Sequence, residues 1–290
     1  MKNSDKYLLS EIKVIDAASF IAGPSAATIM SDYGAEVIKI EPQNGDSLRN
    51  LIANGRMPEG QENYCWELTS RNKKSISLNL KDENAHKILI NLIKDADVFI
   101  TNMPFPIREK LKIRSEDIRP HNDKLIYASL TGYGEVGPDA DRTAYDSMAW
   151  WARSGLMDFV RPSDNSPVAW STPGMGDHPT GMALYGAIMT ALFKREKTGQ
   201  GSEVSTSLMA NGAWANGSGA YSGSFDASVA AISLPTNGNY NSSFQPFYHF
   251  SFSPYNASCD INFGQGTFGT SAVASAGSSS SGDDSVWEYD

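Results

Sequence analysis

The sequence predicts an α/β fold for residues 1–217, with a Rossmann-like, mostly parallel sheet and flanking helices. Two observations support this class. Short apolar segments alternate with helical patterns along the chain, which is typical of βαβ units. Glycine and proline residues gather in the loops that follow the apolar segments, where the ligand-binding edge of such a sheet lies. A chain of 290 residues is also long enough to bury a sizeable core.

The first predicted βαβ unit begins with segment 11–18, EIKVIDAA, which has the pattern of a buried strand. The loop SFIAGPSA then leads into a helix that Gly34 is placed to end. Segment 35–42, AEVIKIEP, predicts a second strand, which Pro42 closes. Because a helical crossover joins the two strands, we expect them to be parallel.

Further strands are predicted over 73–81, 97–101, 124–130 and 202–208. Segment 82–96 predicts an amphipathic helix with Asp82 as its N-cap. A second helix is predicted over 145–157. A third is predicted over 180–199, with basic residues in its last turn and Gly199 as its stop.

Residues 218–290 differ from the rest of the chain in composition. They are rich in Ser, Gly and Asn, and no Lys or Arg follows Lys197. Helical periodicity is missing and the closing run is of low complexity. We therefore expect an atypical or disordered tail, although a β-rich piece or sequence foreign to the domain would also fit. The predicted organisation is a large domain over 1–217 and an unassigned tail over 218–290.

Charge and hydropathy exclude several classes of protein. The net charge is −9 without a basic patch, which argues against a nucleic-acid partner. The polar N-terminal segment has no apolar h-region, and the apolar run LYGAIMTALF is about half of the ~20 residues that span a membrane. Cys65 and Cys259 lack the spacing of a disulfide framework or a metal site. We expect a soluble, cytoplasmic protein with no metal and no membrane partner.

A dinucleotide cofactor is not favoured. The first predicted strand is followed by Gly23 alone, without the GxGxxG pattern that holds a pyrophosphate. Glu41 stands where a ribose-binding acid would lie, but without those glycines a solvated strand end is the simpler interpretation. We expect no permanently bound cofactor.

Two basic clusters follow or precede predicted strands: Arg71, Lys73 and Lys74 at a strand entrance, and Arg108, Lys110 and Lys112 after a strand end. Either cluster could be a solvated positive edge. Lys and Arg side chains also pair with phosphates. If both clusters lie on one edge of the sheet, as we expect, they favour a phosphate-bearing ligand.

The segment PGMGDHPTGM places Asp177 between a glycine and a histidine, just before the third predicted helix. One interpretation is a helix N-cap. The other is a carboxylate nucleophile that the helix dipole holds ionised. Gly174, Gly176 and Gly181 would then leave backbone N–H groups open to a developing oxyanion. We expect His178 to have a structural or binding role, because a carboxylate nucleophile needs no general base.

These stretches resemble the class III CoA-transferase family, which includes formyl-CoA, carnitine and phenyllactate CoA-transferases and the related α-methylacyl-CoA racemases. The matching segments include VIDAASFIAGPSAATIMSDYGAEVIKIEPQNGD, NKKSISLNLK, ADVFITN, LIYASLTGYGEVGP and GMGDHPTGM, between about residues 11 and 217. The phenyllactate branch, which acts on 2-hydroxy or enoic acids, is the most similar. The C-terminal part of the chain does not match.

The resemblance implies a mechanism in which Asp177 attacks an acyl-CoA co-substrate and then forms an aspartyl-CoA thioester. An acceptor carboxylic acid receives the CoA. The resemblance also implies a homodimer. The CoA contacts that it implies are Ile21, Ala22, Asn72, Lys73, Lys74, Asn102, Arg108 and Lys110, with Tyr145 at the border of the site.

Two other functions remain open. In the related racemases a histidine replaces Tyr145 and moves a proton, but a tyrosine with a pKa of ~10 is a poor proton shuttle at neutral pH. A truncated, inactive CoA-binding remnant would fit the unmatched C-terminal part. Trp150 and Trp151 could line an aryl pocket, although packing in a core is the simpler interpretation.

Overall fold

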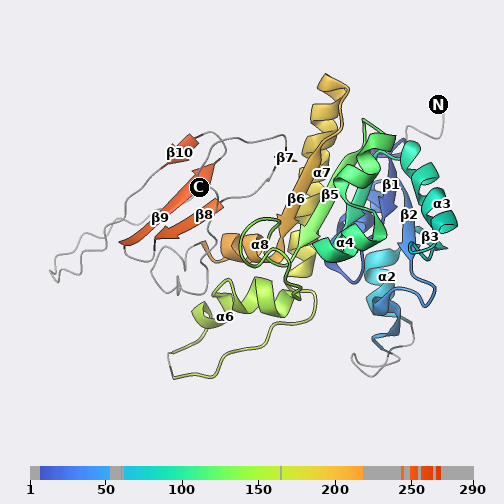
Figure 1. The fold of residues 1–290 in the computed structure, drawn as a ribbon. Coiled ribbons are helices and arrows are strands. Elements are labelled where there is room, and N and C mark those ends of the chain that lie inside the picture. The colour runs from blue at the N-terminus through green and yellow to red at the C-terminus, as the bar shows by residue number, and fades with distance from the viewer. Residues whose placement is uncertain are drawn as a thin grey trace.

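The computed structural model describes residues 7–52, 60, 62–163 and 165–217, together with the backbone of four strands between 243 and 268. The described part contains a parallel sheet in the order β3-β2-β1-β4-β5-β6-β7, with helices on both faces (Figure 1). This confirms the predicted α/β class. The strands are β1 (Lys13–Asp16), β2 (Glu36–Glu41), β3 (Lys74–Ser77), β4 (Val98–Thr101), β5 (Ile126–Thr131), β6 (Glu203–Ser207) and β7 (Ser243–Phe244).

β1 lies inside the sheet between β2 and β4. Val14 is in register with Val37 of β2 and Val98 of β4. Every residue of β4 and of β5 is buried, as expected for strands with helices on both faces. Because all pairs are parallel, the carboxyl ends of the strands lie along a single edge.

The longer helices are α1 (Ala22–Asp32), α3 (Glu83–Lys94), α7 (Asp177–Thr198) and α8 (Leu208–Ala215). Shorter ones are α2 (Tyr64–Ser70), α4 (Phe105–Leu111), α5 (Ser115–Ile118), α6 (Leu156–Phe159), two 3-10 turns (Ser47–Asn50 and Arg119–His121) and a π-helical segment (Ser147–Ala152). Two apolar clusters fill the two faces of the sheet. Neighbouring β1 residues alternate between them: Val14 packs with α1 and α7, and Ile15 packs with α3.

The predicted helix signals are confirmed in most places. The Asp82 side chain accepts hydrogen bonds from the Asn84 and Ala85 N–H groups and caps α3. Gly34 and Gly199 adopt positive φ angles of 97° and 70° directly after α1 and α7. The continuous helix predicted over 145–157 is wrong, because Gly155 (φ 84°) separates the π-helical segment from α6.

Beyond residue 217, the described strands are β7 and an antiparallel sheet of β8 (His249–Ser253), β9 (Asn256–Phe263) and β10 (Gly266–Phe268). The rest of the predicted tail lies outside the described residues. Among the helices that the structure describes, none is both long and apolar enough to cross a bilayer.

Candidate active site

The candidate site lies where β1 ends, α1 begins and α7 begins. The β1–α1 loop, residues 17–21, brings the Phe20 ring edge-on to Tyr145, with ring centroids 5.8 Å apart. Ser25 in the first turns of α1 lies 3.3 Å from the Nδ1 atom of His178 at the start of α7. Three segments far apart in the sequence therefore meet at the carboxyl edge of the sheet.

Asp177 is the first residue of α7, three residues before the predicted start of that helix. Gly176 occupies the N-cap position and makes no side-chain cap, so the N-cap interpretation of Asp177 is wrong. Among the described residues, none donates a hydrogen bond to the Asp177 carboxylate. The acid is half-buried.

The pKa of Asp177 is raised to about 7, first by burial and second by the negative charge of Asp146. We expected the helix dipole to hold this acid ionised. Burial and the neighbouring carboxylate outweigh that effect, because both disfavour the charged form. A carboxylate with such a pKa is ionised in part at neutral pH and is a stronger nucleophile than an ordinary aspartate.

Asp146 is a site residue that we did not predict. It is 7% exposed, its Oδ1 accepts the Ser147 N–H at 2.7 Å, and its Oδ2 accepts the Gly176 N–H at 3.3 Å. It therefore ties the π-helical segment to the start of α7. Its position directly after Tyr145 and before an apolar pattern was the available signal in the sequence.

The three glycines near Asp177 have different structural roles. Gly174 has a φ angle of +82°, in the region that favours glycine. A Cβ at Gly176 would lie 2.4 Å from Trp150 Cγ, and one at Gly181 would lie 2.7 Å from the backbone oxygen of Ala22 in α1. The Gly176 N–H already donates to Asp146, so this group is not open to an oxyanion as we had predicted.

The residues on either side of this site are buried. Trp150 and Trp151 are 7% and 6% exposed and stack on each other, which supports core packing. Burial lowers the pKa of His178, which favours its neutral imidazole. The Nδ1 atom of this ring forms a hydrogen bond with the Ser25 hydroxyl at 3.3 Å.

The predicted CoA contacts do not all meet at this site. Ile21 is half-buried directly before α1, and Ala22 is buried as its first residue. The Asn102 side chain binds the backbone of Ser19, with its Oδ1 at 2.9 Å from the N–H and its Nδ2 at 2.8 Å from the oxygen. The ammonium group of Lys73 donates to Asp16, Pro24 and Thr69, so it has no hydrogen left for a phosphate.

Asn72 and Lys74 lie at the other edge of the sheet. The Asn72 amide donates to Asp32, the last residue of α1, and Lys74 pairs with Glu36, the first residue of β2. The two ends of an 11-residue helix such as α1 are about 15 Å apart. The first basic cluster is therefore divided: Lys74 lies at the amino edge, whereas the ammonium group of Lys73 reaches Asp16 at the carboxyl end of β1.

Arg108 in α4 belongs to the second basic cluster and is 2% exposed. Its Nε donates to the Met103 oxygen and its Nη1 donates to Glu135 at 2.8 Å. Its buried Nη2 has no partner among the described residues. Lys110 is exposed on the same helix, and Tyr145 is 60% exposed beside Phe20.

Within the described part of the chain, no group of three or more His, Cys, Asp or Glu side chains has the arrangement of a metal site. The chemistry of the site is that of carboxylates, backbone amides and one neutral imidazole.

The fold and the site define a class: an α/β protein that places a half-buried carboxylate at the start of a long helix, beside the loop that follows the interior strand β1. The model of CoA-transferase family III matches residues 9–251. The chain belongs to this family. The match extends beyond residue 217, where the resemblance read from the sequence ends.

The curated relatives are CoA-transferases. The (R)-2-hydroxy-4-methylpentanoate CoA-transferase of Clostridioides difficile is 40% identical over 202 residues, 69% of this chain and 50% of that protein. The cinnamoyl-CoA:phenyllactate CoA-transferase of Clostridium sporogenes is 41% identical over 203 residues, 70% of this chain and 49% of that protein. The chain spans about half the length of the curated relatives it matches.

Solved structures give the same fold. A CAIB/BAIF family protein from Brucella suis aligns with 79% of this chain and 59% of its own, with a TM-score of 0.68 and 28% identity. Rv3272 from M. tuberculosis aligns with 73% of this chain and 58% of its own, with a TM-score of 0.67 and 28% identity.

Proposed function

We propose that this chain transfers CoA from an acyl-CoA to a carboxylic acid, with Asp177 as the covalent nucleophile. The observation that carries the proposal is the state of that carboxylate. It lies at the helix start without a hydrogen-bond donor among the described residues, and its pKa is raised to about 7. A partly desolvated carboxylate of this kind can attack a thioester carbonyl.

The proposed reaction balances without an oxidant or a metal. An Asp177 oxygen attacks the thioester carbonyl carbon, the C–S bond breaks, and an acyl-aspartyl anhydride and CoA thiolate result. The thiolate then attacks the aspartyl carbonyl, which releases the donor acid and leaves an aspartyl-CoA thioester. An acceptor carboxylate then attacks the aspartyl-CoA thioester, which releases CoA thiolate and leaves an anhydride between Asp177 and the acceptor. The thiolate attacks the acceptor's carbonyl carbon in this anhydride, so that the new acyl-CoA leaves and the Asp177 carboxylate is regenerated.

Asp146 has a supporting role in this proposal. Its charge raises the pKa of Asp177, and its hydrogen bond to the Gly176 N–H fixes the residue that precedes the nucleophile. Tyr145, which directly precedes Asp146 and is 60% exposed, is our candidate for a residue that contacts the acyl group. Arg108, with its unsatisfied Nη2, would bind a phosphate of CoA.

The substrate class in this proposal comes from two relatives. The C. difficile and C. sporogenes proteins are named for 2-hydroxy-4-methylpentanoate and phenyllactate, which are both 2-hydroxy acids. We propose a 2-hydroxy or enoic acid as the acceptor for this chain. The homodimer that the family resemblance implies is part of the same proposal.

Covalent trapping tests the nucleophile. The purified chain is incubated with an acyl-CoA and then with hydroxylamine, which converts an aspartyl anhydride or thioester into a hydroxamate. Mass spectrometry of the peptides should place the hydroxamate on Asp177 in the wild type and find none in Asp177→Asn. The control variant Asp158→Asn, which changes an exposed acid in α6, should label like the wild type.

A hydroxamate on another residue, or equal labelling of Asp177→Asn, would contradict the proposed nucleophile. Exchange of the substrate α-proton with deuterated solvent, in the absence of any acceptor acid, would support the racemase alternative instead.

A further inference from the structure

Within the β1–α1 loop, the backbone of residues 18–20 is bound by side chains that lie outside the loop. The Ala18 N–H donates to Asp16, and the Ala18 oxygen accepts from Lys39 at 2.9 Å. Both backbone groups of Ser19 bind Asn102. The Phe20 N–H donates to Asp46 at 3.2 Å. Each backbone polar group from the Ala18 N–H to the Phe20 N–H therefore has a side-chain partner.

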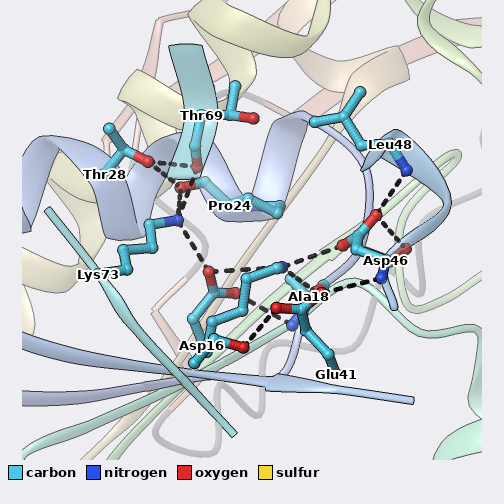
Figure 2. Close-up of polar contacts among 12 residues, drawn as sticks. Asp16, Ala18, Pro24, Thr28, Glu41, Asp46, Leu48, Thr69 and Lys73 are labelled. Atoms are coloured by element: carbon cyan, nitrogen blue, oxygen red, sulfur yellow. Dashed lines mark hydrogen bonds and ion pairs between the residues drawn. The ribbon is translucent and has the colours of Figure 1, made fainter. Parts of the chain in front are cut away.

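A buried charge cluster organises these contacts. Lys39 in β2 pairs with Asp46 at 3.0 Å and lies 3.8 Å from Asp16. Asp16 also pairs with Lys73 at 2.9 Å, as Figure 2 shows. The Lys39, Asp16 and Asp46 side chains are at most 2% exposed. Although burial alone would raise the pKa of Asp16, the charges of Lys39 and Lys73 lower it below its usual value.

Asp46 differs from the other acids of the cluster because it touches the loop, its own turn and the lysine at once. Its Oδ1 accepts from the Phe20 N–H and from the Ser19 hydroxyl. The same oxygen caps the 3-10 turn through the Leu48 N–H (Figure 2). Its Oδ2 pairs with Lys39. The charge of Lys39 thus holds Asp46 in place while Asp46 holds the loop.

Phe20 is where this loop departs from ordinary backbone geometry. Its φ angle of 62° lies in the left-handed region, which is unfavourable for a bulky residue and persists only where neighbours enforce it. In this conformation the Phe20 ring meets Tyr145, which directly precedes Asp146. The next residue, Ile21, has its Cδ1 3.7 Å from the position that a Cβ of Gly174 would occupy.

We propose that Asp46, held by Lys39, is a positioning residue that keeps the β1–α1 loop in its strained conformation and so shapes the entrance to Asp177 for acyl-CoA. This inference rests on the proposed CoA-transferase function for the identity of the ligand. The loop geometry itself does not depend on any ligand, so the two can be tested separately.

Amide hydrogen exchange of the ligand-free 290-residue chain tests the loop. In Asp46→Ala, the Phe20 amide should exchange about tenfold faster or more, because its charge-assisted hydrogen bond is lost. The Ser19 amide, which Asn102 binds, should also exchange faster because the loop loses the contact between Asp46 and the Ser19 hydroxyl. The matched control is Asp97→Asn. Asp97 pairs with Arg195 at 2.8 Å and accepts the Lys13 N–H, but at the opposite edge of the sheet. This control should leave the loop amides unchanged.

Asp46→Asn provides a second variant if the alanine variant does not fold. It keeps an oxygen acceptor for the Phe20 N–H but removes the charge that Lys39 holds, so the acceleration should be smaller yet measurable. Unchanged exchange at residues 19 and 20 in the folded Asp46 variant would overturn the proposal.

Acyl-CoA binding gives the second readout. The Kd for acyl-CoA should rise about tenfold in Asp46→Ala, whereas the maximal rate of Asp177 labelling at saturating acyl-CoA should stay within about twofold. A merely structural role would lower the labelled fraction and leave the Kd unchanged, which would overturn the proposal. If the wild type bound no acyl-CoA, the proposed function would fail, while the exchange result would still decide whether Asp46 holds the loop.

Discussion

At the scale of one residue, the raised pKa of Asp177 predicts how the free energy of unfolding depends on pH. The folded-state value is about 7, against 3.8 for an unperturbed aspartate. The contribution of Asp177 to folding stability is fully present below pH 3.8 and is lost as the pH rises through 7. The reason is that between these values Asp177 is ionised in the unfolded chain but still protonated in the folded one. Asp177→Asn should therefore be more stable than the wild type at pH 8, by up to about 4 kcal/mol, and similar to it at pH 4.

Denaturant unfolding at the two pH values measures this difference. A free-energy difference that does not change between pH 4 and pH 8 would mean that Asp177 has an ordinary pKa in the folded chain. The free energy of unfolding that the wild type loses by keeping Asp177 at pH 8 is an example of the trade-off between stability and function that proteins show at functional residues.

Single residues also show what the sequence could reveal about the site. Asp177 could be singled out because glycines flank it in a segment with a specific family resemblance. Lys73 and Asn102 were singled out as ligand contacts, but their side chains bind Asp16 and Ser19 inside the protein. Asp46 was missed, because its role depends on the left-handed conformation of Phe20, which has no signature in the sequence.

At the scale of elements, the packing of α1 against α7 predicts opposite effects for two glycines of the same helix. A Cβ at Gly181 would lie 2.7 Å from both the Ala22 oxygen and the Ser25 Cβ, whereas a Cβ at Gly186 would have nothing within 4 Å. Gly181→Ala should lower the free energy of unfolding by about 1–3 kcal/mol, because the helices must move apart.

The matched variant Gly186→Ala should raise the free energy of unfolding by about 0.5–1 kcal/mol, through helix propensity alone. Chemical denaturation of both variants measures the pair. Equal effects of the two substitutions would show that the close approach of α1 and α7 does not depend on Gly181.

The elements were predictable where a local signal decides them. Gly34, Asp82 and Gly199 mark helix ends in the sequence and do so in the structure. The π-helical segment was not predictable, because its break at Gly155 and its tie through Asp146 to the start of α7 depend on tertiary packing.

At the scale of the whole molecule, acid stability should depend on the charges at the end of β2. The pKa of Glu41 is lowered to about 2: burial alone would raise it, but hydrogen bonds from Arg49 and Ser75 outweigh that effect. A lowered folded pKa adds stability above the unfolded value of 4.5, and this stability is lost as the pH falls through 2. Glu41→Gln should cost about 2–3 kcal/mol of unfolding free energy at pH 7.

This difference between Glu41→Gln and the wild type should shrink as the pH is lowered toward 2, and urea unfolding across that range measures it. A constant difference would indicate that the substitution acts through packing rather than through the charge.

The class of fold was predictable because the alternation of strands and helices is periodic along residues 11–208. The placement of charged residues on the sheet was less so. Lys74 begins β3 and therefore lies at the amino edge, whereas Arg108 follows β4 at the carboxyl edge, and sequence spacing alone did not separate these edges.

The indole of Trp150 lies against the bare backbone of Gly176, immediately before the proposed nucleophile. A larger residue there would have to displace that aromatic ring from the interior. For the proposed acyl transfer, changes in acyl preference should therefore be sought at the exposed Tyr145 rather than in this turn.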